Sequence, residues 1–272
     1  IGLIVRHITD EGHLEVRQLG GINYSSIEGE GVTIHTRDGR KYRGMVICKS
    51  HSVHVFDDAR TAPRDELHME VILHEDVKSK EDVMNLGIDH GDVISIDPHF
   101  EYTPSGYVKS RFIDDKAAVA ALFEMIAYFK RNNLKPKYRT LLAFPLYEEI
   151  GHGGAYVPEE VSEYVALDIG LIGPDYHGNE TTVSICAKDN YSPYDRGLTN
   201  RIILQAKKAN LNYCVDVFYR YGTDANAAIR AGNNVYAAAF GMACINSHGM
   251  ERCHISAIEE TAKLAIAYAL DI

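Results

Sequence analysis

Short apolar runs alternate with turn signals over residues 1 to about 108, a pattern typical of an all-β domain. The turn pair Asp38-Gly39 lies between two such runs and favours a hairpin. The predicted strands are residues 3–8, 14–19, 32–36, 44–50, 69–73 and 93–96. The charged stretch 75–82 is predicted to be a short exposed helix or a loop. This spacing of short strands predicts a small barrel or sandwich.

The hydrophobic period changes after about residue 110. Apolar residues at helical spacing predict a long, well-buried helix over residues 117–129. Strand and helix patterns then alternate, with strands at 138–147, 164–169, 180–186, 213–219 and 234–240 and helices at 197–210, 224–232 and 257–270. This alternation predicts an α/β domain with a mostly parallel sheet covered by helices.

Composition excludes several classes of function. The 272 residues are 46% hydrophobic and 24% charged, and no apolar run approaches the roughly 20 residues that span a bilayer. The net charge of −10 argues against a nucleic-acid partner and favours cations or a substrate ammonium group. Five scattered cysteines without a Cys-x-x-Cys motif indicate a reducing, cytoplasmic location. The chain opens without methionine inside the apolar run Ile1-Gly2-Leu3, so we expect a preceding segment.

The most informative motif is the pair Glu148-Glu149. It follows the apolar run 141–147 and precedes a glycine-rich turn at 151–154. A strand that ends in this way delivers two carboxylates to the edge of a sheet, where α/β enzymes build their sites. One carboxylate can bind a metal while the other moves protons.

Other acidic and imidazole groups lie at similar junctions. Asp114 and Asp115 precede the long helix, Asp168 follows a strand, and His248 and His254 precede the last helix. A single Asp at a helix start is commonly an N-cap, but all of these ends converge on one edge of a parallel sheet. Oxygen ligands with imidazole suit zinc, cobalt or manganese, and one carboxylate can bridge two ions.

The order and spacing of these motifs resemble those of the di-metal deblocking, glutamyl and tetrahedral aminopeptidases, a family whose members were also called endoglucanases. The matching motifs are Ile1-Gly2, the β module with Gly20-Gly21, Asp114-Asp115-Lys116, Glu148-Glu149-Ile150-Gly151, Asp168, Gly222-Thr223-Asp224-Ala225 and the C-terminal His segment. The resemblance spans essentially the whole chain. It implies a catalytic α/β di-metal peptidase domain at 1–4 and 99–272, with its amino-terminal part missing, and an inserted β-barrel-like dimerisation domain at 5–98.

The resemblance also implies roles for the site residues, with two divalent ions per subunit, zinc or cobalt. Asp114 resembles the ligand that bridges both ions and is joined to Asp115 by a cis peptide bond. Glu148 resembles the general base, while Glu149 and Asp168 resemble ligands of one ion each.

Further positions are implied less directly. Asp115 would orient a histidine ligand expected just before Ile1, and Asp224 would line the site. Lys116 replaces the family's arginine. For the C-terminal ligand, spacing to the last helix favours His248 over His254, and both stay open.

The sequence therefore predicts a metal-dependent aminopeptidase that removes the N-terminal residue of short peptides through a metal-activated water. The implied partners are peptides with a free N-terminus and further copies of the chain, from dimers up to dodecamers, with no nucleic acid and no membrane. One alternative is a related di-metal N-acyl-amino-acid deacylase or carboxypeptidase, and another is a non-catalytic oligomeric scaffold. An endoglucanase is disfavoured, because a glycosidase needs two carboxylates flanking a sugar rather than a set of metal ligands.

Overall fold

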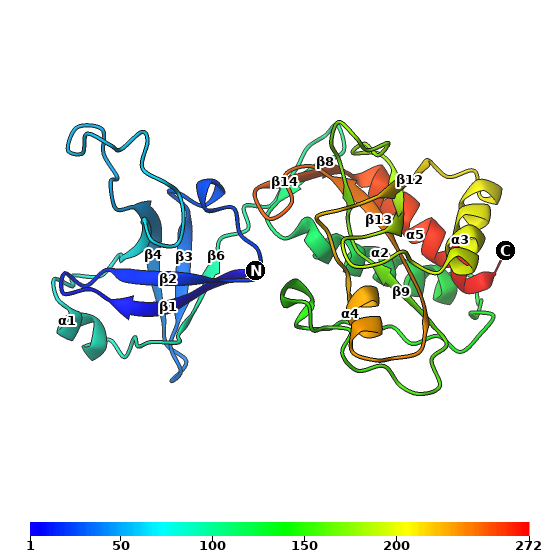
Figure 1. Ribbon diagram of the computed structural model, residues 1–272, viewed down its shortest axis with the longest axis horizontal. Helices are drawn as coiled ribbons and strands as arrows, with labels where there is room; N and C mark the ends of the chain where they lie inside the picture. The colour runs from blue at the N-terminus through cyan, green and yellow to red at the C-terminus, as the bar shows by residue number, and fades with distance from the viewer. Residues whose placement is uncertain (272) are drawn as a thin grey trace. The chain divides into compact units, whose positions relative to one another are not determined.

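The computed structural model describes residues 1–271 and divides the chain into two compact units, Ile1–Pro98 and the residues from His99 onward. Each unit has its own core of buried apolar side chains. Figure 1 shows the helices and strands of both units.

The first unit is a closed antiparallel barrel with the strand order β1-β2-β5-β4-β3-β6. Its strands are β1 (Gly2–Ile8), β2 (Leu14–Leu19), β3 (Gly31–His35), β4 (Lys41–Cys48), β5 (Met69–Leu73) and β6 (Val93–Ile96), and the short helix α1 covers Lys80–Asn85. Side chains alternate between the core and the outer face of the barrel. On β3, Val32 and Ile34 are buried, whereas Thr33 between them is only partly buried, and the sequence pattern reflects this alternation. Leu3 pairs with Gln18 and with Ile94, so residues 1–4 lie in the barrel rather than in the α/β unit where the sequence placed them.

The second unit contains a mixed sheet. It is formed by β9 (Glu163–Leu167), β10 (Gly170–Leu171), β11 (Val183–Lys188), β12 (Tyr213–Val217) and β13 (Tyr236–Cys244). β13 pairs in parallel with β9 and β10, β11 pairs in parallel with β12, and β11 and β13 are antiparallel. A smaller sheet has the order β14-β8-β7, from Glu251–His254, Tyr107–Ser110 and Glu101–Tyr102.

Helices cover both faces of the larger sheet (Figure 1). On one face α2 (Ile113–Arg131), α3 (Arg196–Lys208) and α5 (Ile255–Leu270) pack against Ala238 and Phe240 of β13. On the other face α4 (Asp224–Arg230) contributes Ala225 to a cluster with Ala237 and Ala239. Successive residues of β13 therefore serve opposite cores, because a strand sends alternate side chains to opposite faces.

The sequence-based strand at 138–147 is wrong. None of the described strands pairs with this segment, and the pair of glutamates after it lies in a 3₁₀ turn, η2 (Glu148–Ile150). Leu141, Phe144 and Leu146 are exposed, and Phe144 stacks on Phe123 of α2 with ring centroids 5.7 Å apart. Apolar composition alone predicted a buried strand here, but a strand also needs a hydrogen-bonded neighbour.

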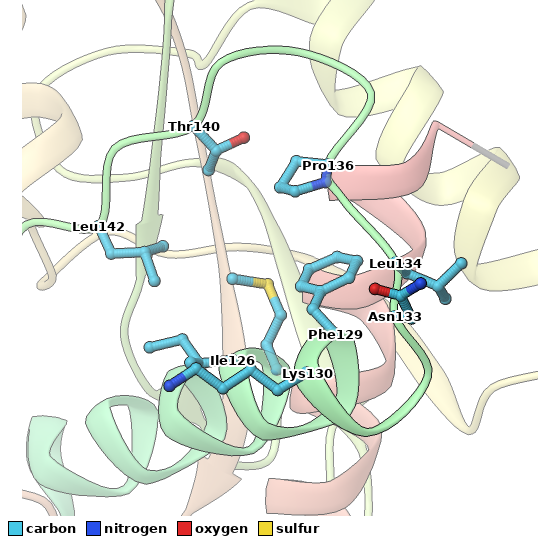
Figure 2. A pocket seen from close by; sticks show the side chains of 9 residues that line it. Ile126, Phe129, Lys130, Asn133, Leu134, Pro136, Thr140 and Leu142 are labelled. Carbon is cyan, nitrogen blue, oxygen red and sulfur yellow. The ribbon is translucent and has the colours of Figure 1, made fainter.

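A cavity of about 420 Å³ lies between the second half of α2 and the segment that follows it (Figure 2). Phe129 lies on the α2 side of the cavity, and Pro136, Thr140 and Leu142 line it from the segment that follows the helix. The lining is mostly apolar and contains no candidate metal ligand. Within residues 1–271, no helix has the length and apolar character that crossing a membrane requires.

Candidate active site

Three segments that are distant in the sequence bring their polar side chains together in the second unit. Asp114 comes from the start of α2, Glu149 from η2, and His248 from the loop between β13 and β14. Their ligand atoms all lie within 4.8 Å of one another. Nε2 of His248 is 3.4 Å from Oδ2 of Asp114 and 3.4 Å from Oε2 of Glu149.

The backbone at each of these positions departs from regular structure. Asp114 and Asp115 have non-helical dihedral angles inside the first turn of α2, and the peptide bond between them is cis, as the resemblance implied. His248 has a φ of 63°, a left-handed conformation that is uncommon outside glycine. Gly151, with a φ of 72°, ends η2. The loops are thus shaped to aim polar side chains rather than to continue helices or strands.

Buried negative charge dominates the electrostatics of the cluster. Burial, followed by repulsion from Glu149 and Asp114, raises the pKa of Glu148 to about 9. Burial and then Asp114 raise the pKa of Glu149 to about 7. Burial and then Asp114 also raise the pKa of Asp115 to about 6. A divalent cation would neutralise this excess charge, and carboxylate oxygens with one imidazole nitrogen match the donors that zinc and cobalt accept, so the residues fit such an ion.

Asp168 adjoins this cluster. It follows β9, is 4% exposed, and accepts the Ile169 N–H at 2.6 Å. Its pKa is raised well above the usual value, first by burial and then by the charges of Asp114, Glu148 and Asp115. Asp168 is not among the three residues whose ligand atoms lie within 4.8 Å of one another. It is nevertheless close enough for the charge of Asp114 to raise its pKa.

Asp224 begins α4 behind the glycine-rich turn. It is 6% exposed, and N–H groups of Gly153 and Gly154 bond to its carboxylate. A Cβ atom built on Gly153 would lie 2.2 Å from Oδ2 of Asp224, so only glycine permits this approach. The charge of Asp224 contributes to the raised pKa values of Glu148 and Asp115, which places it beside the site.

The two candidate histidines have different surroundings. His248 joins the cluster, and its pKa is raised mainly by its hydrogen bond with Asp114. His254 is the N-cap of α5, where Nδ1 accepts the Ser256 N–H at 3.2 Å. Nε2 of His254 lies 3.0 Å from the Ser105 carbonyl oxygen, so both of its ring nitrogens are already engaged.

Glu251, three residues after His248, received no role from the sequence. This residue is fully buried, and its carboxylate accepts the Asp114 N–H at 3.0 Å and the His248 N–H at 3.1 Å. Its pKa is raised to about 7 by burial, against the lowering effect of these backbone bonds. One feature of the sequence could have indicated its burial. Glu251 and the apolar Cys253 are two residues apart on β14, and side chains at this spacing lie on the same face of a strand, here the buried one.

Comparison with known proteins gives a consistent result. The profile of the M42 glutamyl aminopeptidase family matches residues 1–264. YhfE of Bacillus subtilis (strain 168), a proposed aminopeptidase, is 39% identical over 269 residues, which cover 98% of this chain and 78% of YhfE.

Solved structures show the same fold. One of them is the TET1 peptidase of Pyrococcus horikoshii, which can assemble into a tetrahedron or a large octahedral shell. It is 25% identical in sequence to this chain and superposes with a TM-score of 0.81. The match covers 100% of this chain and 81% of that chain. The TET aminopeptidase of a marine sediment thaumarchaeote is 19% identical with a TM-score of 0.82, covering 98% of this chain and 77% of that chain.

Proposed function

Because the chain belongs to the M42 glutamyl aminopeptidase family, we propose that it is a metal-dependent aminopeptidase that removes the N-terminal residue of short peptides. The observation that supports this proposal best is the convergence of Asp114, Glu149 and His248 within 4.8 Å. Glu148 is adjacent in sequence to one of these ligands and is buried in the same negative charge. A set of ligands with a neighbouring free carboxylate suits metal-assisted hydrolysis, in which an ion activates water and a base accepts its proton.

We assign two divalent ions, zinc or cobalt, to this site. Glu149 and His248 would hold one ion, Asp168 would hold the other, and Asp114 would contact both. Bound ions would lower the pKa of a water molecule and polarise the scissile carbonyl group. The raised pKa values of the free carboxyl groups support this assignment, because their repulsion is relieved only by a cation or by protons.

Glu148 acts as the general base. Its carboxylate accepts a proton from the attacking water and then delivers that proton to the nitrogen of the leaving amine. Glu149 cannot share this role, since its carboxylate faces the imidazole of His248 at 3.4 Å. Asp115 and Asp224 add further negative charge near Glu148, as their effect on its pKa indicates.

The same charge selects the substrate. A peptide with a free N-terminus brings an ammonium group, which the surplus carboxylates attract, whereas an N-acylated peptide brings none. This favours an aminopeptidase over the deacylase or carboxypeptidase alternatives.

We further propose that the chain forms homo-oligomers through its barrel unit, from dimers up to the dodecamer reported for the Pyrococcus TET1 structure. Five free cysteines, all buried, support a reducing cytoplasmic location.

The test is to measure metal content and turnover of aminoacyl-p-nitroanilides by the full-length protein, before and after chelation and with zinc or cobalt restored. We expect about two ions per chain and activity that chelation abolishes and metal restores. Parallel assays with free and N-acetylated peptides separate the alternatives. If the protein contains metal but hydrolyses only the N-acetylated substrates, the deacylase replaces the aminopeptidase. If the full-length protein binds no metal, the proposed function is contradicted.

A further inference from the structure

We propose that Glu251 is a positioning residue that fixes the spacing between Asp114 and His248. The inference rests on the proposed function, because that function makes these two residues metal ligands. Glu251 contacts the backbone of both, and it does not belong to the ligand set itself.

Strand pairing brings Glu251 to this position. Glu251 opens β14 and lies opposite Ser110 at the end of β8. The chain leaves β8, turns at Phe112 with a φ of 65°, and enters α2. The side chain of Glu251 therefore meets the first residues of α2, although 137 positions in the sequence separate it from Asp114.

One carboxylate joins both loops. Oε2 of Glu251 accepts the Asp114 N–H at 3.0 Å, and Oε1 accepts the His248 N–H at 3.1 Å. The Ile113 backbone contributes a further hydrogen bond. Glu251 is fully buried, so water does not compete for these donors. The spacing between the ligand atoms of Asp114 and His248, 3.4 Å in this structure, follows from where their main chains are held.

Only a carboxylate meets the requirement of this position. Both of its oxygens accept, whereas an amide of the same shape offers one accepting oxygen and an NH₂ group. In Glu251→Gln, that NH₂ group would face one of the two backbone N–H groups, donor against donor. One loop would lose its anchor while the size of the side chain and the packing around it stay the same.

A purely structural reading is that Glu251 satisfies backbone groups and stabilises the fold without affecting the ligands. The two hypotheses predict different metal affinities for variants that are equally destabilised. If Glu251 only stabilises the fold, its variant binds metal as well as any other variant of the same stability, whereas a positioning role predicts weaker binding. Side chains that orient metal ligands typically change affinity about 10- to 100-fold when they are altered.

The experiment titrates Co²⁺ into metal-free full-length protein and follows the visible absorption bands of the bound ion together with the melting temperature. Glu251→Gln is compared with Glu259→Gln, an exposed glutamate on α5, and with Val183→Ala, which destabilises the core of the same unit. We expect about 10- to 100-fold weaker Co²⁺ binding and altered bands in Glu251→Gln only.

Two results would overturn the inference: unchanged affinity and spectrum in Glu251→Gln, or a loss of affinity no larger than that of Val183→Ala at equal destabilisation. If Glu251→Gln does not fold, Glu251→Asp provides the test. The shorter side chain cannot reach the backbone of both loops, so we expect this variant protein to bind Co²⁺ more weakly than the unaltered protein. If the unaltered protein binds no Co²⁺, the proposed function fails rather than this inference.

Discussion

At the scale of single residues, the adjacent glutamates Glu148 and Glu149 have different surroundings and should have separable roles. Glu149 lies 3.4 Å from His248, whereas Glu148 lies outside the ligand set. We expect Glu148→Gln to retain its metal and to lose about 10²- to 10⁴-fold in kcat, because the amide cannot accept the proton. Metal content and kcat on aminoacyl-p-nitroanilides check this.

Glu149→Gln is the matched control, since it makes the same chemical change one residue later. It should lose metal affinity along with activity, because an amide is a weaker ligand than a carboxylate. Unchanged turnover in Glu148→Gln, or metal loss in that variant as severe as in Glu149→Gln, would contradict the division of roles.

The glycine-rich turn leads to a second prediction for single residues. Gly153 lets the carboxylate of Asp224 approach so closely that a Cβ would lie 2.2 Å from one oxygen and 2.5 Å from the other. Gly153→Ala should therefore force Asp224 and the turn apart, at a cost of about 1–3 kcal/mol in stability, and lower kcat by moving Glu148.

Thermal unfolding and kinetics measure these two effects. Gly173→Ala is the control, because a Cβ there has its nearest neighbour, a ring atom of Tyr176, at 3.4 Å. Equal melting temperatures and activities for the two alanine variants would show that the turn tolerates the displacement.

At the scale of elements, the helix cap distinguishes the two histidines. His254 caps α5 through Nδ1, so His254→Ala should lower the free energy of unfolding by about 1 kcal/mol and leave metal affinity intact. His248→Ala should do the reverse, because its imidazole belongs to the ligand set and caps no helix. Denaturant unfolding and metal titration of both variants give the result, and metal loss in His254→Ala would invalidate the assignment.

Elements were predictable from the sequence where local pattern and tertiary partner agree. The strand expected at 69–73 matches β5, and the helix expected at 117–129 lies inside α2, because Met69 and Val71 of β5 and apolar side chains of α2 such as Met125 are buried in their cores. The segment 138–147 had the same apolar composition without a pairing strand, which no local pattern reveals. Composition reports that a segment is apolar, and long-range hydrogen bonding decides whether it becomes a strand.

The site shows the same limit. The order of the motifs grouped Asp114 and Glu149 with one of two histidines, His248 or His254, and in the structure the ligand atoms of Asp114, Glu149 and His248 lie within 4.8 Å of one another. Glu251 received no role from the sequence, because its partners are backbone N–H groups, which nearly every residue carries, and one of them is 137 positions away. Side-chain chemistry marks ligands in a sequence, whereas the role of a side chain that holds their main chains becomes visible only in the fold.

At the scale of the whole molecule, the chain has two cores, and the three described side chains whose ligand atoms converge, Asp114, Glu149 and His248, belong to the second unit. A bound ion stabilises only the structure that holds it, by about 2.7 kcal/mol when its free concentration is 100 times the Kd. Chelation should therefore act locally. We expect it to raise amide hydrogen exchange at the first residues of α2, in η2 and in the loop around His248, and to leave strands β3 and β4 of the barrel unchanged.

Hydrogen-exchange mass spectrometry of the full-length protein, with metal and after chelation, tests this expectation. Peptides from β3 and β4 serve as the internal reference, because their core residues Ile34 and Val46 are fully buried in the barrel. An equal rise in exchange throughout both units would mean that metal binding stabilises the chain as a single cooperative unit. A rise confined to the three ligand-bearing segments would show that the ion joins parts of the second unit that the sequence keeps far apart.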